Sequence, residues 1–102
     1  MMEKTKYPKN RLPTHPGEIL LEEFLIPMNI SQVTLAKHLG ILIQRINEIV
    51  RGKRGITPVT AWLLSQAFGN TPEFWMNLQV TYDLARSQPK HKIMPLAVAV
   101  NP

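Results

Sequence analysis

Residues 44–57, QRINEIVRGKRGIT, place amide, guanidinium and ammonium side chains on a short helical pattern. Their apolar residues Ile46, Ile49 and Val50 recur at i, i+3 and i+4, which is one stripe of a helix. A side-chain amide can pair with adenine through two hydrogen bonds, and a guanidinium can pair with guanine or a phosphate. The stretch therefore has the groups of a helix that reads base pairs. A plain amphipathic helix with a solvated face has the same pattern, so the rest of the chain has to distinguish the two.

The residues expected to contact nucleic acid lie at the start of this helix, in the loop after it, and at the start of the helix before it. Gln44 is expected to pair with adenine and Arg45 with guanine or a phosphate. Glu48 repels phosphate, so it is expected to accept from a cytosine amino group or to orient a neighbouring arginine. The loop cations would bind the flanking backbone and make affinity sensitive to salt. The full set comprises Gln32, Ile43, Gln44, Arg45, Asn47, Glu48, Arg51, Lys53 and Arg54.

The spacing between residues 31 and 51 predicts a helix-turn-helix. Two short helices that cross steeply need a small residue at the crossing, a glycine at the turn, and apolar residues that fix the second helix to the first. Ala36, Gly40 and the pair Ile46 and Ile49 stand at the positions that these requirements set. The complete pattern, counted from Gln32, consists of Leu35, Ala36, Leu39, Gly40, Ile41, Ile46 and Ile49.

Five short helices are predicted to position this unit, and nothing between residues 15 and 86 alternates with the period of a strand. Hydroxyl caps followed by proline, Thr57-Pro58 and Thr71-Pro72, predict the starts of the last two helices. Pro27 is expected to end the first. The predicted helices are 16–26, 31–39, 42–51, 58–68 and 72–86. A flexible basic arm is expected over residues 1–14. A tail is expected over residues 87–102, either disordered or ordered only when a partner binds it.

Composition and charge favour a polyanion partner and disfavour other classes. The 102 residues carry a net charge of +5, with cations concentrated in the arm and in residues 31–54. The chain has no cysteine, which excludes disulfides and thiolate metal sites. Its apolar runs are far shorter than the ~20 residues that span a membrane, and no secretory signal is present. A cytoplasmic protein is therefore expected, without a membrane partner.

An enzyme is the main alternative class, and the sequence disfavours it. His15, His38 and His91 are scattered without metal-ligand spacing, and each is expected at the surface. No phosphate-binding glycine loop or nucleophile motif is present. We therefore expect no catalytic residue, no metal and no cofactor.

Four segments together resemble the HigA (VapI-like) antitoxins of bacterial type II toxin–antitoxin modules. They are THPGEILLEEFL, LAKHLGI, QRINEIVRGKRGIT and GNTPEFWMNLQVTYDL, and the resemblance covers about residues 14–86. It implies a lambda-repressor-like (Xre) fold and a homodimer that binds an operator palindrome in double-stranded DNA. It also implies autorepression of the operon and neutralisation of a HigB-type, RelE-like toxin that cleaves mRNA. A stand-alone Xre-type regulator without a toxin is the alternative.

The start of the third predicted helix departs from the common pattern of this class. Many of its recognition helices begin with a polar cap, whereas Leu42 and Ile43 are apolar here. They are expected either to contact thymine methyl groups or to cover protein surface.

A dimer is expected because a single short helix makes few contacts. Its candidate surface is the last helix with the tail, through Phe74, Trp75 and Tyr82, although Phe74 and Trp75 also suit a core.

Overall fold

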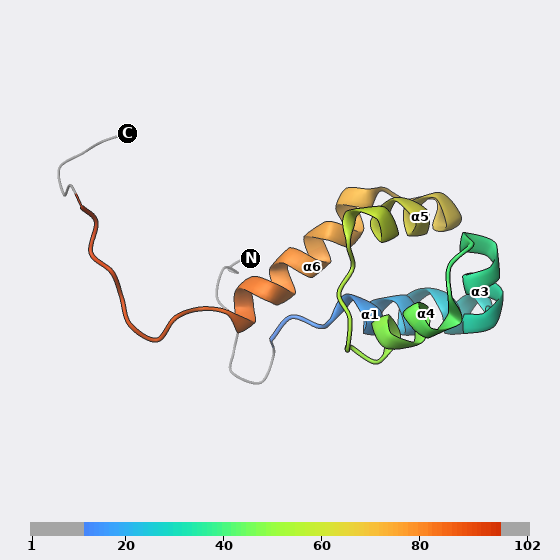
Figure 1. Cartoon of the computed structure of the whole chain (residues 1–102), viewed down its shortest axis with the longest axis horizontal. Helices are drawn as coiled ribbons and strands as arrows, with labels where there is room; N and C mark the ends of the chain where they lie inside the picture. Colours follow the sequence, from blue (N-terminus) through green and yellow to red (C-terminus); the bar gives the residue numbers. More distant parts are fainter. Residues whose placement is uncertain (1–11, 97–102) are drawn as a thin grey trace.

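The computed structural model describes residues 12–96 and contains five helices and no strand in that range (Figure 1). The first helix has three consecutive segments, α1 (Pro16–Ile19), η1 (Leu20–Leu25) and α2 (Ile26–Met28). The others are α3 (Gln32–Leu39), α4 (Ile43–Val50), α5 (Pro58–Phe68) and α6 (Pro72–Arg86). The predicted all-α, five-helix fold is confirmed. Most of the predicted arm and the last six residues of the predicted tail lie outside the described range.

The first helix ends later than Pro27 predicted. It continues to Met28 and stops at Asn29, whose φ of 56° is left-handed. The segment η1 is a π-helix, in which the Ile26 N–H donates to the Leu21 carbonyl five residues earlier. A proline ring clashes with the carbonyl four residues before it in an α-helix, and the wider π turn relieves that clash. The prediction was wrong because it assumed α-helical geometry.

The other helix ends follow their local sequence signals. The hydroxyl oxygens of Ser31, Thr57 and Thr71 accept from backbone N–H groups three residues later, at 3.0, 3.4 and 3.1 Å. Gly40 and Gly69 end α3 and α5 with φ near +73°, a conformation that glycine adopts without steric cost. These caps confirm the predicted starts of α3, α5 and α6 and the predicted ends of α3 and α5.

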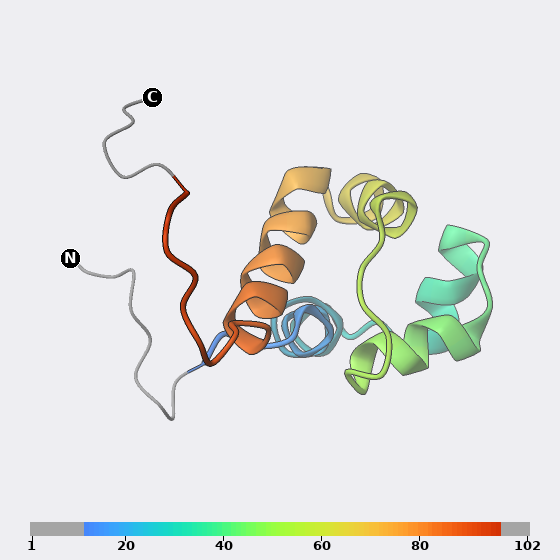
Figure 2. The same cartoon turned by 60° about the vertical axis from the view of Figure 1, so that its left-hand side comes forward.

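The core lies where the first helix packs between α4 on one side and α6 on the other, with α5 against α6 (Figure 2). Trp75 is its largest fully buried side chain, and its indole N–H donates to Asn70 Oδ1 at 2.9 Å. Of the two roles that the sequence left open for Trp75, dimer surface and core, its full burial in this fold matches the core role. The apolar core comprises Leu20, Leu25, Leu35, Ala36, Ile46, Ile49, Ile56, Ala61, Leu64 and Trp75.

Within residues 12–96, no single helix has the length and apolar character needed to cross a membrane. One bent pair, Pro16–Met28 with Gln32–Leu39 at 101°, has them only when its two helices are counted together.

Candidate nucleic-acid interface

Helices α3 and α4 form the predicted helix-turn-helix. The Ala36 carbonyl accepts from the N–H groups of Gly40 at 2.9 Å and Ile41 at 3.1 Å, which closes the turn. Ala36 is buried, and Ile46 and Ile49 are fully buried against the core. The steric roles predicted for these positions are confirmed, so the face of α4 opposite Ile46 and Ile49 points outward.

Four of the predicted site residues are paired across that outward face. Gln44 and Glu48 lie one helical turn apart, and Gln44 Nε2 donates to Glu48 Oε2 at 3.4 Å. Asn47 Nδ2 donates to Gln32 Oε1 at 3.3 Å, which joins the outward face of α4 to the start of α3. The structure therefore brings Gln32, Gln44, Asn47 and Glu48 into one polar surface.

Glu48 orients an arginine of the following loop. Arg54 Nε donates to Glu48 Oε1 at 2.9 Å, although the two residues lie on different elements. This hydrogen bond from Arg54 is the largest cause that holds the pKa of Glu48 below its usual value. Of the two roles expected for Glu48, the structure shows the one in which it positions a neighbouring arginine.

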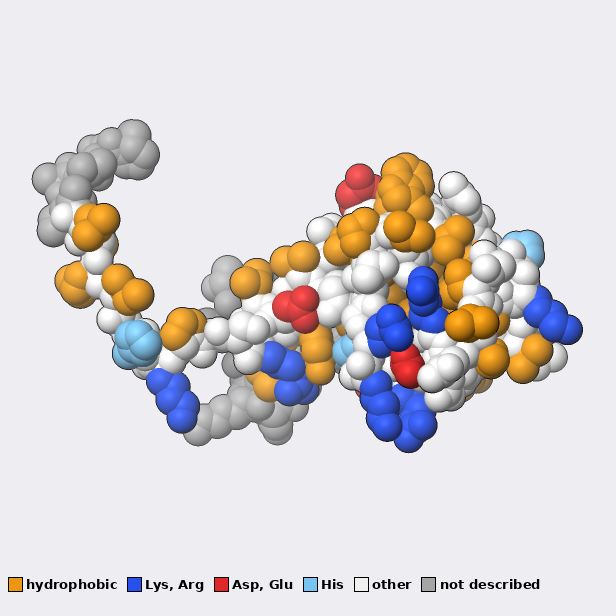
Figure 3. Space-filling model, in the orientation of Figure 1, with side chains coloured by type: hydrophobic (Ala, Val, Ile, Leu, Met, Phe, Trp, Pro, Cys, Tyr) orange, Lys and Arg blue, Asp and Glu red, His pale blue; other side chains and the backbone are white. Residues whose placement is uncertain are grey.

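The cations follow the end of α4. Arg51, Lys53 and Arg54 are exposed, and Figure 3 shows Lys and Arg side chains gathered over α4 and its loop around one acidic side chain. Gly52, with φ of 74°, turns the chain here, and the Lys53 N–H donates to the Glu48 carbonyl at 2.8 Å. In the described part of the chain, Glu48 with Arg54 is the only ion pair. The loop therefore presents net positive charge beside the polar face.

Arg45 follows Gln44 in the sequence but lies on a different side of α4. It precedes the fully buried Ile49 by four residues, so the two share one stripe of the helix. Arg45 is consequently half-buried at the flank of the outward face. Asn47 and Glu48 are half-buried as well, so burial does not distinguish between the two contacts expected of Arg45, with guanine or with a phosphate.

Two residues that support the loop were not identified from the sequence. Gln79 of α6 is buried, and its Oε1 accepts from the Ile56 N–H at 2.6 Å. His15 caps α1 through Nδ1, which accepts from the Gly17 N–H at 2.8 Å. Gln79 acts on a partner 23 residues away that only the fold brings near. The partner of His15 is only two residues away, but histidine is not among the residues that usually signal an N-cap.

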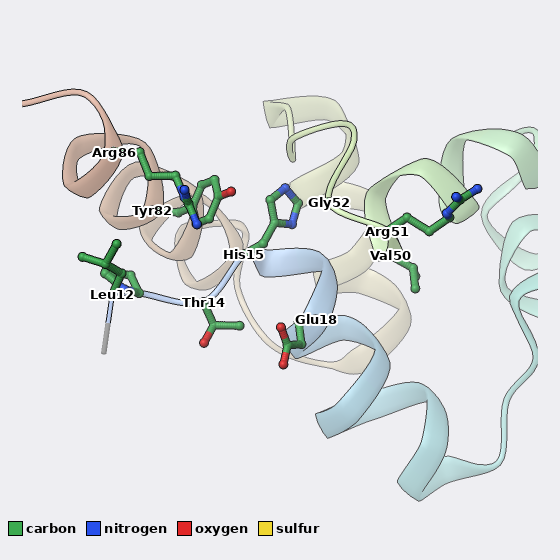
Figure 4. Close-up of a pocket in the computed structure, with 10 residues that line it drawn as sticks. Leu12, Thr14, His15, Glu18, Val50, Arg51, Gly52, Tyr82 and Arg86 are labelled. Atoms are coloured by element: carbon green, nitrogen blue, oxygen red, sulfur yellow. The ribbon is translucent and has the colours of Figure 1, made fainter. Parts of the chain in front are cut away.

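His15 is half-buried rather than at the surface as predicted. Figure 4 shows its ring between Gly52 and Tyr82, and the two aromatic rings meet edge to face at 4.8 Å. Burial is the largest cause that lowers the pKa of His15; Asp83 opposes it and Arg86 adds to it. The ring thereby joins the start of α1, the loop after α4, and α6.

The chain matches the family model described as Helix-turn-helix over residues 21–75. It is 51% identical to Virulence-associated protein I of Dichelobacter nodosus over 81 residues, which are 78% of this chain and 75% of that protein. It is 42% identical to Antitoxin HigA-1 of Vibrio cholerae over 83 residues, covering 81% and 74% of the two chains. Among solved structures, Pseudomonas aeruginosa antitoxin HigA with the higBA promoter is 43% identical, with a TM-score of 0.78 over 83% of this chain and 99% of that one. The chain belongs to the helix-turn-helix family that includes the HigA antitoxins.

Proposed function

We propose that this protein is a non-enzymatic antitoxin that binds the operator of its own operon as a dimer and neutralises a HigB-type, RelE-like toxin that cleaves mRNA. The observation that carries the proposal is the outward face of α4, where an amide-bearing surface continues into a cationic loop. Amides suit base edges in the major groove, and cations suit the phosphates that flank it. The similarity to a HigA structure with its promoter supports the same use of this face.

Fluorescence anisotropy tests the DNA-binding part of the proposal. The duplex upstream of the gene and a scrambled duplex of equal length are titrated with the protein at one fixed salt concentration. We expect tight binding to the upstream duplex alone. Equal, salt-sensitive binding to both duplexes would mean that the protein is a basic helical domain that binds DNA without sequence specificity.

Gln44 and Lys53 are expected to contribute differently to operator binding. Gln44→Ala removes a group that can pair with adenine, so operator affinity should fall about tenfold or more while scrambled DNA is little affected. Lys53→Ala removes a phosphate contact, so it should weaken both duplexes alike and lower the slope of log K against log salt by about one. Anisotropy titrations at several salt concentrations measure both effects. If the two variants lost affinity in the same pattern, the division between base and phosphate contacts would be wrong.

The dimer surface is proposed on α6, as a revision of the sequence-based set. Val80 and Leu84 lie one turn apart and are 47% and 68% exposed. Phe74 is 37% exposed but packs edge-on against Trp75, and Tyr82 lies against His15 and below Arg86. Val80 and Leu84 therefore offer the most apolar area on this helix for a second copy. Two copies would place two recognition helices on successive turns of the duplex.

Leu84→Glu is expected to convert the dimer to a monomer, because it would bury two carboxylates beside each other in a twofold interface. Sedimentation velocity at micromolar concentration measures the change. Trp62→Glu is the matched control, since Trp62 is also exposed, at 57%, but lies on α5. A monomer with Trp62→Glu and a dimer with Leu84→Glu would move the interface to α5.

The toxin partner is tested by co-purification with the product of a short, basic reading frame beside this gene. A complex that blocks mRNA cleavage by that product supports the antitoxin role. Absence of such a neighbour, with operator binding intact, would favour the alternative of a stand-alone Xre-type regulator.

A further inference from the structure

We infer that Leu42 and Ile43, at the start of α4, form an apolar contact that selects operators carrying thymine methyl groups at the corresponding base pairs. This inference rests on the proposed operator binding and adds the chemical group that the start of the helix recognises. It chooses between the two roles that the sequence left open for these residues.

Both side chains leave apolar area exposed to solvent. Leu42 is 73% exposed and Ile43 is 42% exposed, although Ile46 and Ile49 of the same helix are fully buried. Folding therefore gains little from Leu42 and only part of what full burial of Ile43 would give. The two adjacent side chains, next to the polar residues of α4, offer an apolar surface to a group from outside the domain.

The start of α4 also lacks the cap that every other helix in the described range has. His15, Ser31, Thr57 and Thr71 each accept a backbone N–H of the helix that follows them. Leu42 occupies the same extended conformation, with φ of −68° and ψ of 140°, and provides no side-chain acceptor. A serine there would cap the helix and avoid exposed apolar area. Stability alone therefore does not account for leucine at this position.

The surroundings identify the partner group. Leu42 and Ile43 are followed directly by Gln44 and Arg45, and the cations Lys53 and Arg54 lie in the loop that follows the far end of this short helix. A polyanion is the partner that this charge favours, and the N-terminal residues of a recognition helix are those that reach base edges. The 5-methyl group of thymine is the apolar group that base pairs present in the major groove.

Single replacements of thymine by deoxyuridine test the inference, because they remove one methyl group and keep the base pair. The probe is the tightest duplex selected by the full-length protein from a random library, with each thymine replaced in turn. At one or two positions in each half-site, we expect wild-type affinity to fall about fourfold for each methyl lost. Ile43→Ala and Leu42→Ser should each remove this difference at their own position. Ile26→Ala is the matched control, since Ile26 is 58% exposed on α2, and it should keep the full difference.

A thermal melt separates recognition from folding. Leu42→Ser provides the missing cap, so its midpoint should rise while its sensitivity to the thymine methyl is lost. If the selected duplex is bound specifically but no replacement by deoxyuridine changes affinity, the inference is wrong and the proposed function stands. If the selection yields no preferred duplex, the proposed function and this inference both fail. A methyl effect that persists in both variants would assign it to another part of the protein and overturn the inference.

Discussion

Gly17→Ala is expected to destabilise the domain by at least about 3 kcal/mol, a large fraction of the stability of a small protein. Gly17 lies in the first turn of α1 and is buried against α4. A methyl group added at its Cα would fall on the Ile49 carbonyl oxygen, well inside van der Waals contact. The obstacle is the backbone of the recognition helix, so relief requires a shift of α4 relative to α1.

Helix propensity predicts the opposite sign, because alanine is favoured over glycine in a helix by about 1 kcal/mol. Urea denaturation followed by far-UV circular dichroism decides between the two. Gly69→Ala is the control: Gly69 has φ of 73°, and nothing lies within 4 Å of its added Cβ. The stability of the Gly69→Ala variant should fall by only about 1 kcal/mol, which is the cost of placing an alanine in the left-handed conformation. A Gly17→Ala protein as stable as wild type would mean that α1 and α4 pack less closely than the structure shows.

The helix-turn-helix and most helix ends were predictable because they depend on neighbours in the chain. Ser31, Thr57 and Thr71 cap backbone groups three residues away, and Gly40 turns the chain locally. The burial of Ile46 and Ile49 follows from helical spacing alone. Local rules suffice where the partner is within one helical turn.

Local rules failed where the geometry or the partner was not local. Pro27 did not end its helix, because a π segment made room for the ring. Trp75 lies in the core rather than on a surface, because Phe24 and Phe68 from two other helices pack against it. The spacing of Trp75 along its helix would be the same whether the residue lay in the core or on a dimer surface. Burial of an amphipathic aromatic residue therefore depends on which helices the fold places over it.

The candidate site shows the same division. The outward position of Gln44 and Glu48 follows from the spacing of Ile46 and Ile49, since opposite faces of one helix are fixed together. The ion pair of Glu48 with Arg54 needs the turn at Gly52, which the spacing within α4 does not predict. Residue types could be named from the sequence, whereas their pairing required the course of the loop.

Gln79→Leu is expected to cost about 3 kcal/mol of stability and to weaken operator binding as well. The Gln79 amide oxygen is the acceptor for the N–H of Ile56, whose side chain is only 3% exposed. Leucine has a similar volume but no acceptor, so this N–H would remain buried without a partner. The amide nitrogen also donates to Asp83 Oδ1 at 3.0 Å, and that hydrogen bond would be lost too.

The effect on DNA follows from the position of Ile56. Ile56 lies near the end of the loop that carries Arg51, Lys53 and Arg54, and its hydrogen bond to Gln79 joins this loop to α6. Gln66→Leu is the matched control, because Gln66 is exposed on α5, and it should leave both properties near wild type. Urea denaturation measures stability, and hydrogen exchange of the Ile56 amide reports the lost bond directly. At a temperature where both variants remain folded, Gln79→Leu should bind the operator more weakly than Gln66→Leu. If the Ile56 amide stayed protected in Gln79→Leu, the loop would be held by another contact, and its cations would not depend on α6.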